Sequence, residues 1–488
     1  MFACSPVEDA HSPTIGCLCH HPAFARFNAQ LTQKFSRRAF LSGAAAAVGA
    51  AALWPKAASA GIPAAPALPV AFTNVLVFDG KSNALRKGLR VIVEGNRIKA
   101  VEPAEQPLSK GIQVIDGGGR TLMPGLIDAH WHTMMAAVPM AQLLVADVGL
   151  LNLMAADQAE KTLMRGFTTV RDMAGPSFSL KRAIDAGLTA GPRIYPSGAM
   201  ISQTSGHGDF RLPYEVPGPQ NAPLSRGAAI GGGMIADGVD EVLKRTREQL
   251  MMGATQIKLA AGGGVASNYD PIDVSQYTEA EFRAASDAAE NWGTYTTVHA
   301  YTSRAIQTAI RGGVKCIEHG QLMDEETAKI LADKNIWLSS QPFLADADSN
   351  HYPAGSASEA KSKMVAAGTD RVYGYAKKHK LKTAWGTDIL FNAAQTVKQG
   401  RLLAKMTRWY TPAEVLTTAT SVNAELCAMS GPRNPYPGKL GVIEADAYAD
   451  LLLIDGDPIA NIDLIADPDK NLVVIMKDGR IFKNTLAA

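Results

Sequence analysis

Between residues 121 and 431, the chain alternates short apolar or β-branched segments with amphipathic segments of helical period. Eight segments have the composition of buried strands: residues 122–132, 167–172, 193–201, 255–260, 295–301, 315–319, 336–341 and 382–388. Helical segments separate most of them, at residues 155–165, 238–252, 279–292, 303–311, 324–333 and 358–379, and a late helix follows Thr411. This alternation predicts a parallel sheet, and eight repeats predict an α/β fold of the (β/α)8 TIM-barrel class.

The flanks of this region have a different pattern. Residues 70–101 and 440–483 look like strands joined by tight turns such as Asp79-Gly80 and Asp455-Gly456. We expect the two flanks to form one small β-sandwich, with domains at 61–124 plus 432–488 (sandwich) and 125–431 (barrel). The long stretch 206–237 is rich in glycine and proline, and so long a loop in a barrel is usually functional.

The N-terminus has the features of an export signal. A twin-arginine pattern at residues 36–41 precedes an apolar run from Ala44 to Trp54, and Ala58-Ser59-Ala60 is a small-residue cleavage site. The apolar run is shorter than a membrane span of about 20 residues, so no stable membrane anchor is expected. We therefore predict a twin-arginine signal region at 1–60 and a periplasmic or secreted mature protein that starts near Gly61.

The charge and the cysteine content argue against a nucleic-acid-binding protein and against a fold held together by disulfides. The formal net charge of +2 comes with no basic stripe, which argues against a nucleic-acid partner. Of five cysteines, three precede residue 60, and Cys316 and Cys427 alone do not make a disulfide framework. Strand alternation relative to His319 predicts that Cys316 packs outward against helices.

The predicted strands carry residues suited to metal binding. His130 and His132 lie on one face of a strand because side chains alternate with period two, so Trp131 points the other way. Lys258 is predicted to enter the barrel between outward-facing neighbours. A buried ammonium is costly unless it is paired, so Lys258 either forms a salt bridge or is carbamylated by CO₂, which makes it an anionic ligand.

Three further candidates end other strands. His299 and His319 each close a strand, and Asp388 ends the eighth. Singly, each histidine would more often be a core residue, whereas for Asp388 the cap of the next helix is the minor alternative to a role in metal binding. However, four of the seven histidines after residue 60 fall at barrel strand ends, where sites of this fold lie. The six residues together can hold two divalent metals and a water molecule, and imidazole suits zinc.

These motifs resemble the amidohydrolase superfamily in its two-metal, carboxylated-lysine subtype. The resemblance rests on residues 123–132, on Lys258, His299 and His319, on residues 386–388, and on the returning strands at 449–455 and 474–480. It implies that His130, His132 and Asp388 hold one metal, that His299 and His319 hold the other, and that carbamylated Lys258 bridges them. The expected cofactors are two divalent ions, most simply Zn²⁺, together with the CO₂-derived carbamate on Lys258.

A narrower resemblance is carried by residues 202–209 and 257–267. They are similar to the branch that holds Xaa-Pro and Xaa-Arg/Lys dipeptidases and ochratoxin-hydrolysing amidases. The resemblance implies that His207 and Tyr301 contact the C-terminal carboxylate of the substrate. Val265 follows a glycine run that lets the backbone approach a ligand, so it is expected to line the site. A homo-oligomer is expected because family members often form one.

The predicted function is hydrolysis of an amide or peptide bond to a C-terminal amino acid, as in a dipeptidase or carboxypeptidase. Ochratoxin A, cleaved to ochratoxin alpha and phenylalanine, is one candidate among such small amide substrates. A hydroxide that bridges the metals would attack the carbonyl, and Asp388 would pass the proton to the leaving amine. A phosphotriesterase or lactonase, or an imidazolonepropionase-like cyclic amidase, on the same metal site stays open. Lys258 argues against a deaminase.

Overall fold

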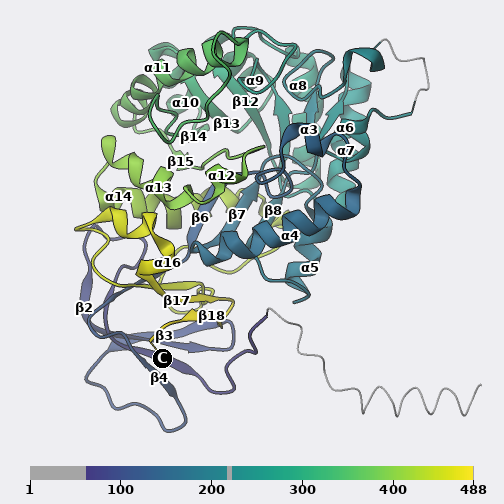
Figure 1. Ribbon diagram of the computed structural model, residues 1–488. Coiled ribbons are helices and arrows are strands. Elements are labelled where there is room, and N and C mark those ends of the chain that lie inside the picture. The colour runs from purple at the N-terminus through teal and green to yellow at the C-terminus, as the bar shows by residue number, and fades with distance from the viewer. Residues whose placement is uncertain (1–61, 217–222, 487–488) are drawn as a thin grey trace, which may run out of the picture. The chain divides into compact units, whose positions relative to one another are not determined.

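A series of parallel strands, most of them followed by helical segments, forms the larger part of the computed structural model, which describes residues 62–216 and 223–486 (Figure 1). The predicted signal region at 1–60 lies outside the described residues. The strands are β6 (Leu126–Trp131), β7 (Phe167–Asp172), β8 (Arg193–Pro196), β9 (Met200–Ser202), β10 (Gly233–Ile235), β11 (Ile257–Ala260), β12 (Thr296–Thr302), β13 (Cys316–Leu322), β14 (Trp337–Ser340) and β15 (Thr383–Trp385). The structure thus has the expected α/β character.

These strands form two parallel sheets, in the orders β6-β7-β8 and β10-β9-β11-β12-β13-β14-β15. Backbone hydrogen bonds connect the two sheets. The Thr255 N–H donates to the carbonyl of Pro196 (2.8 Å), and the Asp388 N–H donates to the carbonyl of His130 (2.8 Å). The second bond places the segment after β15 beside the end of β6, so the first and last strands of the series are neighbours.

Two predicted strands are each divided in the structure. The segment 122–132 separates at Gly125 into β5 (Thr121–Pro124) and β6, which belong to different sheets. A Cβ on Gly125 would lie 2.1 Å from Oγ1 of Thr168, so only glycine allows this close passage. The segment 193–201 separates into β8 and β9 around Gly198, whose φ of +74° interrupts the extended backbone. An uninterrupted apolar run does not reveal such breaks.

The helices lie between and beyond these strands. They are α3 (Met140–Leu143), α4 (Val148–Met164), α5 (Phe178–Asp185), α6 (Arg226–Ala229), α7 (Val239–Met252), α8 (Glu279–Trp292), α9 (Ser303–Arg311), α10 (Glu325–Asp333), α11 (Ala357–Lys378), α12 (Ala393–Thr396), α13 (Gln399–Ala404), α14 (Pro412–Thr417), α15 (Asn423–Ala428) and α16 (Pro468–Asn471). The predicted N-cap Thr411 accepts from the Glu414 N–H, and the Glu414 side chain accepts from the Thr411 N–H in return. The bounds of α8 and α9 agree with the predicted ones.

Strands from both flanks of the chain share one mixed sheet. Its order is β18-β17-β16-β5-β1-β2-β3, with β4 paired to β1. These strands are β1 (Val70–Val77), β2 (Arg86–Glu94), β3 (Arg97–Pro103), β4 (Gln113–Asp116), β5, β16 (Leu451–Ile454), β17 (Leu472–Lys477) and β18 (Arg480–Asn484). The antiparallel pairing of β16 with β5 joins the two flanks. A separate apolar cluster that includes Phe72, Leu122 and Leu453 forms its core.

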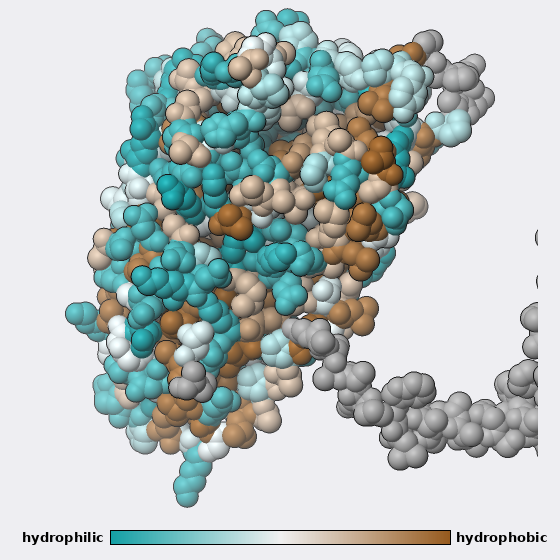
Figure 2. Space-filling view, in the orientation of Figure 1, coloured by the Kyte–Doolittle hydropathy of each residue, from teal (hydrophilic) through white to brown (hydrophobic). Residues whose placement is uncertain are grey.

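The surface mixes polar and apolar side chains. Figure 2 shows hydrophilic residues over much of the visible face, with hydrophobic residues interspersed among them. Within the described ranges, the structure contains no helix that combines the length and the apolarity needed to cross a membrane.

Candidate active site

All the side chains that the sequence analysis singled out for chemistry line one pocket at the carboxyl ends of the parallel strands. They are His130, His132, His207, Lys258, Val265, His299, Tyr301, His319 and Asp388. The pocket wall also contains apolar side chains, among them Phe210, Phe343 and Phe391. The predicted residues therefore meet in space although 258 positions separate the first from the last.

One cluster gathers around the carboxylate of Asp388. Its Oδ1 lies 3.1 Å from Nε2 of His130 and 2.9 Å from Nε2 of His132. Nδ1 of His319 lies 4.0 Å from Oδ2. Ligand atoms of His130, His319 and Asp388 all lie within 4.8 Å of one another, so these three side chains can converge on a single metal ion.

Two members of this cluster have left-handed backbone conformations. The φ angle is +79° at His319 and +55° at Asp388, values that residues other than glycine rarely adopt. At His319 this conformation interrupts strand alternation, so neighbouring Glu318 also reaches the site: its Oε2 accepts from Nδ1–H of His130 at 2.8 Å. Strain of this kind concentrates at functional sites.

A second group of rings lies beside the first. The imidazole of His207 stacks on that of His299, with centroids 3.9 Å apart. The ring centroid of His299 is 4.4 Å from that of His319 and 4.9 Å from that of Tyr301. Nδ1 of His207 lies 2.9 Å from Oγ of Ser267. The structure thus brings His207 and Tyr301 against the histidines predicted to hold metal.

Each of three histidines has one ring nitrogen engaged by a protein acceptor. Nδ1–H of His130 donates to Glu318 (2.8 Å), Nδ1–H of His319 donates to Oε1 of Gln341 (2.6 Å), and Nε2–H of His299 donates to the carbonyl of Gly263 (3.0 Å). In His299 and His319 such partners fix the tautomer and leave the other nitrogen with a free lone pair, which is the usual arrangement around metal-binding histidines, while Nε2 of His130 faces Oδ1 of Asp388. The donor set therefore fits a metal.

Burial sets the charge state of these groups. It lowers the pKa of His319 to about 3 and that of His207 to about 4, and it holds the pKa of His299 well below its usual value. Burial would raise the pKa of Asp388, but the charge of His130 and hydrogen bonds from His130 and His132 keep it well below its ordinary range. The pKa of His130 is raised instead, because burial and Lys258 lower it less than the carboxylates of Asp388 and Glu318 raise it. At neutral pH His299 and His319 thus offer neutral imidazoles and Asp388 an ionised carboxylate, the forms that bind metals.

Lys258 lies at the bottom of the same pocket with only 2% of its surface exposed. Burial lowers the pKa of its ammonium to about 8, against the opposing effects of Glu318 and Asp388. The neutral amine, which is the form that reacts with CO₂, is therefore a minor form near neutral pH but a much larger fraction than in an exposed lysine.

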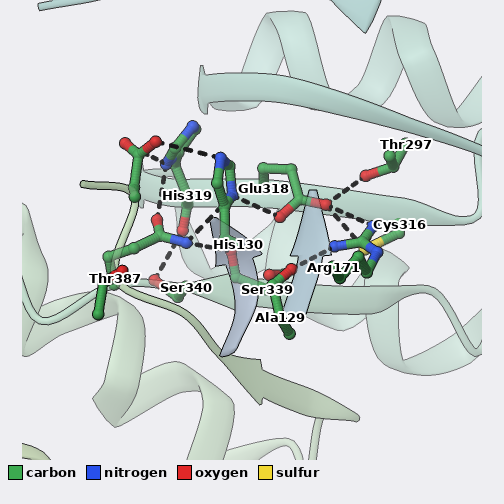
Figure 3. A network of polar contacts seen from close by, with 12 residues as sticks. Ala129, His130, Arg171, Thr297, Cys316, Glu318, His319, Ser339, Ser340 and Thr387 are labelled. Atoms are coloured by element: carbon green, nitrogen blue, oxygen red, sulfur yellow. Dashed lines mark hydrogen bonds and ion pairs between the residues drawn. The ribbon is translucent and has the colours of Figure 1, made fainter. Parts of the chain in front are cut away.

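A buried polar network beneath His130 was not predicted. Glu318 forms an ion pair with Nη2 of Arg171 (2.8 Å) and accepts from the Thr297 hydroxyl, and Arg171 also donates to the carbonyl of Ala129 (2.8 Å) (Figure 3). A charged residue inside the buried strand 167–172 requires a partner, and this requirement could have drawn attention to Arg171. Nothing in the sequence around Glu318 identifies it as the partner of Arg171.

The position of Cys316 differs from the prediction. Its Sγ lies 3.4 Å from Oε1 of Glu318 and 3.8 Å from Nη2 of Arg171, within the network that reaches His130. The prediction that it packs outward against helices is therefore wrong. It assumed regular alternation up to His319, where the backbone is left-handed.

The structural role of Asp128 was also not predicted from the sequence. Its Oδ1 accepts from the backbone N–H groups of His130 and Thr387, both at 3.1 Å, and its Oδ2 accepts from the Thr387 hydroxyl at 2.7 Å. The carboxylate thus ties the backbone that carries His130 to the backbone that carries Asp388. It positions the two ligand candidates relative to each other.

Comparison with known proteins gives consistent matches. The profile of the amidohydrolase family matches residues 121–482. An ochratoxinase from Aspergillus niger is 32% identical over 333 residues, which are 66% of this chain and 67% of that protein. The crystal structure of a prolidase complexed with N-methylphosphonate-L-proline matches with a TM-score of 0.77 and 34% identity, over 86% of this chain and 100% of the prolidase.

Two further solved structures also match this chain. The crystal structure of A. niger ochratoxinase matches with a TM-score of 0.73 and 25% identity, over 86% of this chain and 96% of that one. A Xaa-Pro dipeptidase with methionine bound in its active site matches with a TM-score of 0.73 and 26% identity, over 85% of this chain and 100% of that one. Similarity of this extent implies an α/β fold of the TIM-barrel type.

Proposed function

The chain belongs to the amidohydrolase family and is a hydrolase of amide or peptide bonds, and we propose that it releases a free amino acid from the C-terminal side of its substrate with the aid of two metal ions. The observation that carries the proposal is the pocket in which His207 and Tyr301 lie directly beside His299 and the Asp388 cluster. We also propose that the parallel strands close into the expected (β/α)8 barrel, with β8 and β9 as the two halves of one barrel strand and β10 as an addition beside β9. The hydrogen bond between Asp388 and His130 supports this closure.

The proposed metal ligands fall into two sets. His130, His132 and Asp388 would hold one ion, His299 and His319 would hold the other, and Lys258 would bridge them as a carbamate. Zn²⁺ is the proposed metal because imidazole and carboxylate ligands suit it. When bound, two such ions supply a water of lowered pKa and polarise the substrate carbonyl.

Asp388 is the proposed proton carrier. Its carboxylate is ionised at neutral pH and is held by contacts of Oδ1 with His130 and His132. It can accept a proton from the attacking water and deliver it to the nitrogen of the leaving amino acid. A positioned acid–base group of this kind contributes about 10²- to 10⁴-fold to rate.

His207 and Tyr301 are the proposed contacts for the substrate's carboxylate. Since Nδ1 of His207 is engaged with Ser267, its Nε2 is available for a ligand. Burial holds the pKa of the Tyr301 phenol well above its usual value, so the phenol stays protonated and can donate. The apolar side chains Val265 and Phe343 in the same pocket suit an apolar substrate group, so ochratoxin A, with its phenylalanine, is one candidate substrate.

Removal of metal is expected to abolish hydrolysis of an N-acyl amino acid. The protein is treated with a chelator, dialysed, and assayed for release of free amino acid while its metal content is measured by mass spectrometry. Addition of Zn²⁺ with bicarbonate should restore activity at about two ions per chain, and Zn²⁺ without bicarbonate should restore less. Full turnover by protein without metal would refute the proposed function.

Replacement of Gly264 with alanine is expected to raise KM about tenfold for a carboxylate-bearing substrate. A Cβ on Gly264 would lie 1.9 Å from Nδ1 of His207, so the imidazole must move. A lost hydrogen bond to a charged group corresponds to about tenfold or more in affinity. Gly374→Ala on α11 is the control, because an added Cβ there meets nothing within 4 Å. An unchanged KM in Gly264→Ala would remove His207 from the substrate site.

A further inference from the structure

The ammonium group of Lys361 is bound by three backbone carbonyls of one loop. Nζ donates to the carbonyl oxygens of Gly264 (3.0 Å), Ser267 (3.1 Å) and Asp270 (2.7 Å). Lys361 lies in the first part of α11, while the three carbonyls belong to the segment after β11. An ammonium has three N–H donors, so the loop uses all of them. The three carbonyl oxygens thus surround the ammonium in the way that carbonyl oxygens surround a bound cation.

The same loop reaches the proposed carboxylate contacts. Oγ of Ser267 lies 2.9 Å from Nδ1 of His207, and the carbonyl of Gly263 accepts from His299 at 3.0 Å. Val265, between these positions, lines the pocket. A shift of the loop would therefore move the side of the pocket that holds His207.

A second connection runs through the side chain of Asp270. Its Oδ2 accepts from the Gly264 N–H (2.7 Å) and from Nε2 of Gln276 (3.3 Å). Oε1 of Gln276 accepts from the backbone N–H of His207 (3.0 Å). Both the ring and the backbone of His207 are thus tied to the segment that Lys361 holds.

We propose that Lys361 is a positioning residue for substrate recognition: from α11 it fixes the loop 262–270, and through this loop it holds His207 where a substrate carboxylate binds. Lys361 itself does not line the pocket, although Ser362 and Val365 on the same helix do. Its effect must therefore pass through the loop. The inference rests on the proposed function, because it assigns the device that organises the carboxylate end of that site.

The test compares Lys361→Met with Lys363→Met in the metal-loaded protein. Lys363 lies on the same helix, and its side chain is 71% exposed, so its replacement should change nothing at the site. Methionine at 361 keeps the length of the side chain but leaves the three carbonyls without their donor. We expect the inhibition constant of a free amino acid product to rise about tenfold in Lys361→Met, with metal content unchanged. Lys361→Arg should recover part of the loss.

A second variant covers the case in which Lys361→Met does not fold. Ser267→Ala leaves the lysine contacts in place and removes the link to the His207 ring, so it should raise the same inhibition constant while metal content stays constant. The proposal is overturned if folded Lys361→Met binds the amino acid as the unmodified protein does, if metal is lost in parallel with binding, or if Ser267→Ala has no effect. Failure of the proposed function is distinguishable, because the unmodified protein would then neither bind nor release amino acids.

Discussion

Asp388→Asn is expected to lower kcat for amide hydrolysis about 1,000-fold, within the range attributed to acid–base groups. Asparagine has nearly the same shape and can still accept hydrogen bonds at Oδ1 from His130 and His132, but it cannot take a proton from water. The change should therefore appear in kcat much more than in KM. It is measured by steady-state kinetics, with metal content determined on the same samples.

The control is Asp172→Asn. Asp172 is a buried carboxylate at the end of the neighbouring strand β7, it accepts from the Ser177 hydroxyl at 2.6 Å, and it does not line the pocket. Burial raises its pKa to about 7, so loss of its charge costs little near neutral pH. Activity of Asp172→Asn should stay within a few-fold of the unmodified protein. Equal losses in the two variants, or near-normal kcat in metal-replete Asp388→Asn, would rule out the assigned proton transfer.

Arg171→Met is expected to reduce the free energy of unfolding by about 3–5 kcal/mol, the range found when one partner of a buried ion pair is removed. Both Arg171 and Glu318 are fully buried, and the variant leaves the Glu318 carboxylate without its cation. The carbonyl of Ala129 and the hydroxyl of Tyr295 also lose a hydrogen bond from the guanidinium. Urea unfolding of the metal-free protein measures the change without a contribution from metal binding.

Two further variants make this prediction specific. Arg171→Met combined with Glu318→Gln should be more stable than Arg171→Met alone, because no unpaired charge then remains buried. Arg311→Met removes an exposed ion pair with Glu279 (3.1 Å) and should destabilise the protein far less. If Arg171→Met were no more destabilising than Arg311→Met, the buried ion pair would not stabilise the protein as expected.

The α/β character of the chain could be predicted from the sequence because short apolar or β-branched segments and amphipathic helical segments alternate along it. The predicted bounds of α8 and α9 agree with the structure for this reason, and the start of α8 is also marked by a capping box between Thr278 and Glu281. The breaks at Gly125 and Gly198 could not be predicted, because they depend on close packing and backbone conformation rather than on hydrophobicity.

The candidate site, too, could be predicted from the sequence only in part. Alternation along one strand placed His130 and His132 on a common face, and both contact Asp388 in the structure. The same rule failed at Cys316, because the backbone of His319 is left-handed. Contacts between distant segments, such as those of Glu318 with Arg171 and of Lys361 with the loop 262–270, leave no periodic pattern from which they could be read.

The most direct test of the central claim is the substrate class. Metal-replete protein is incubated in parallel with N-acyl amino acids, dipeptides and ochratoxin A, and with a phosphotriester and a lactone, and released amino acids are quantified. We expect release of a free C-terminal amino acid, and we expect Asp388→Asn to abolish it. Turnover of only the phosphotriester or the lactone would contradict it, and would remove the carboxylate-binding roles of His207 and Tyr301.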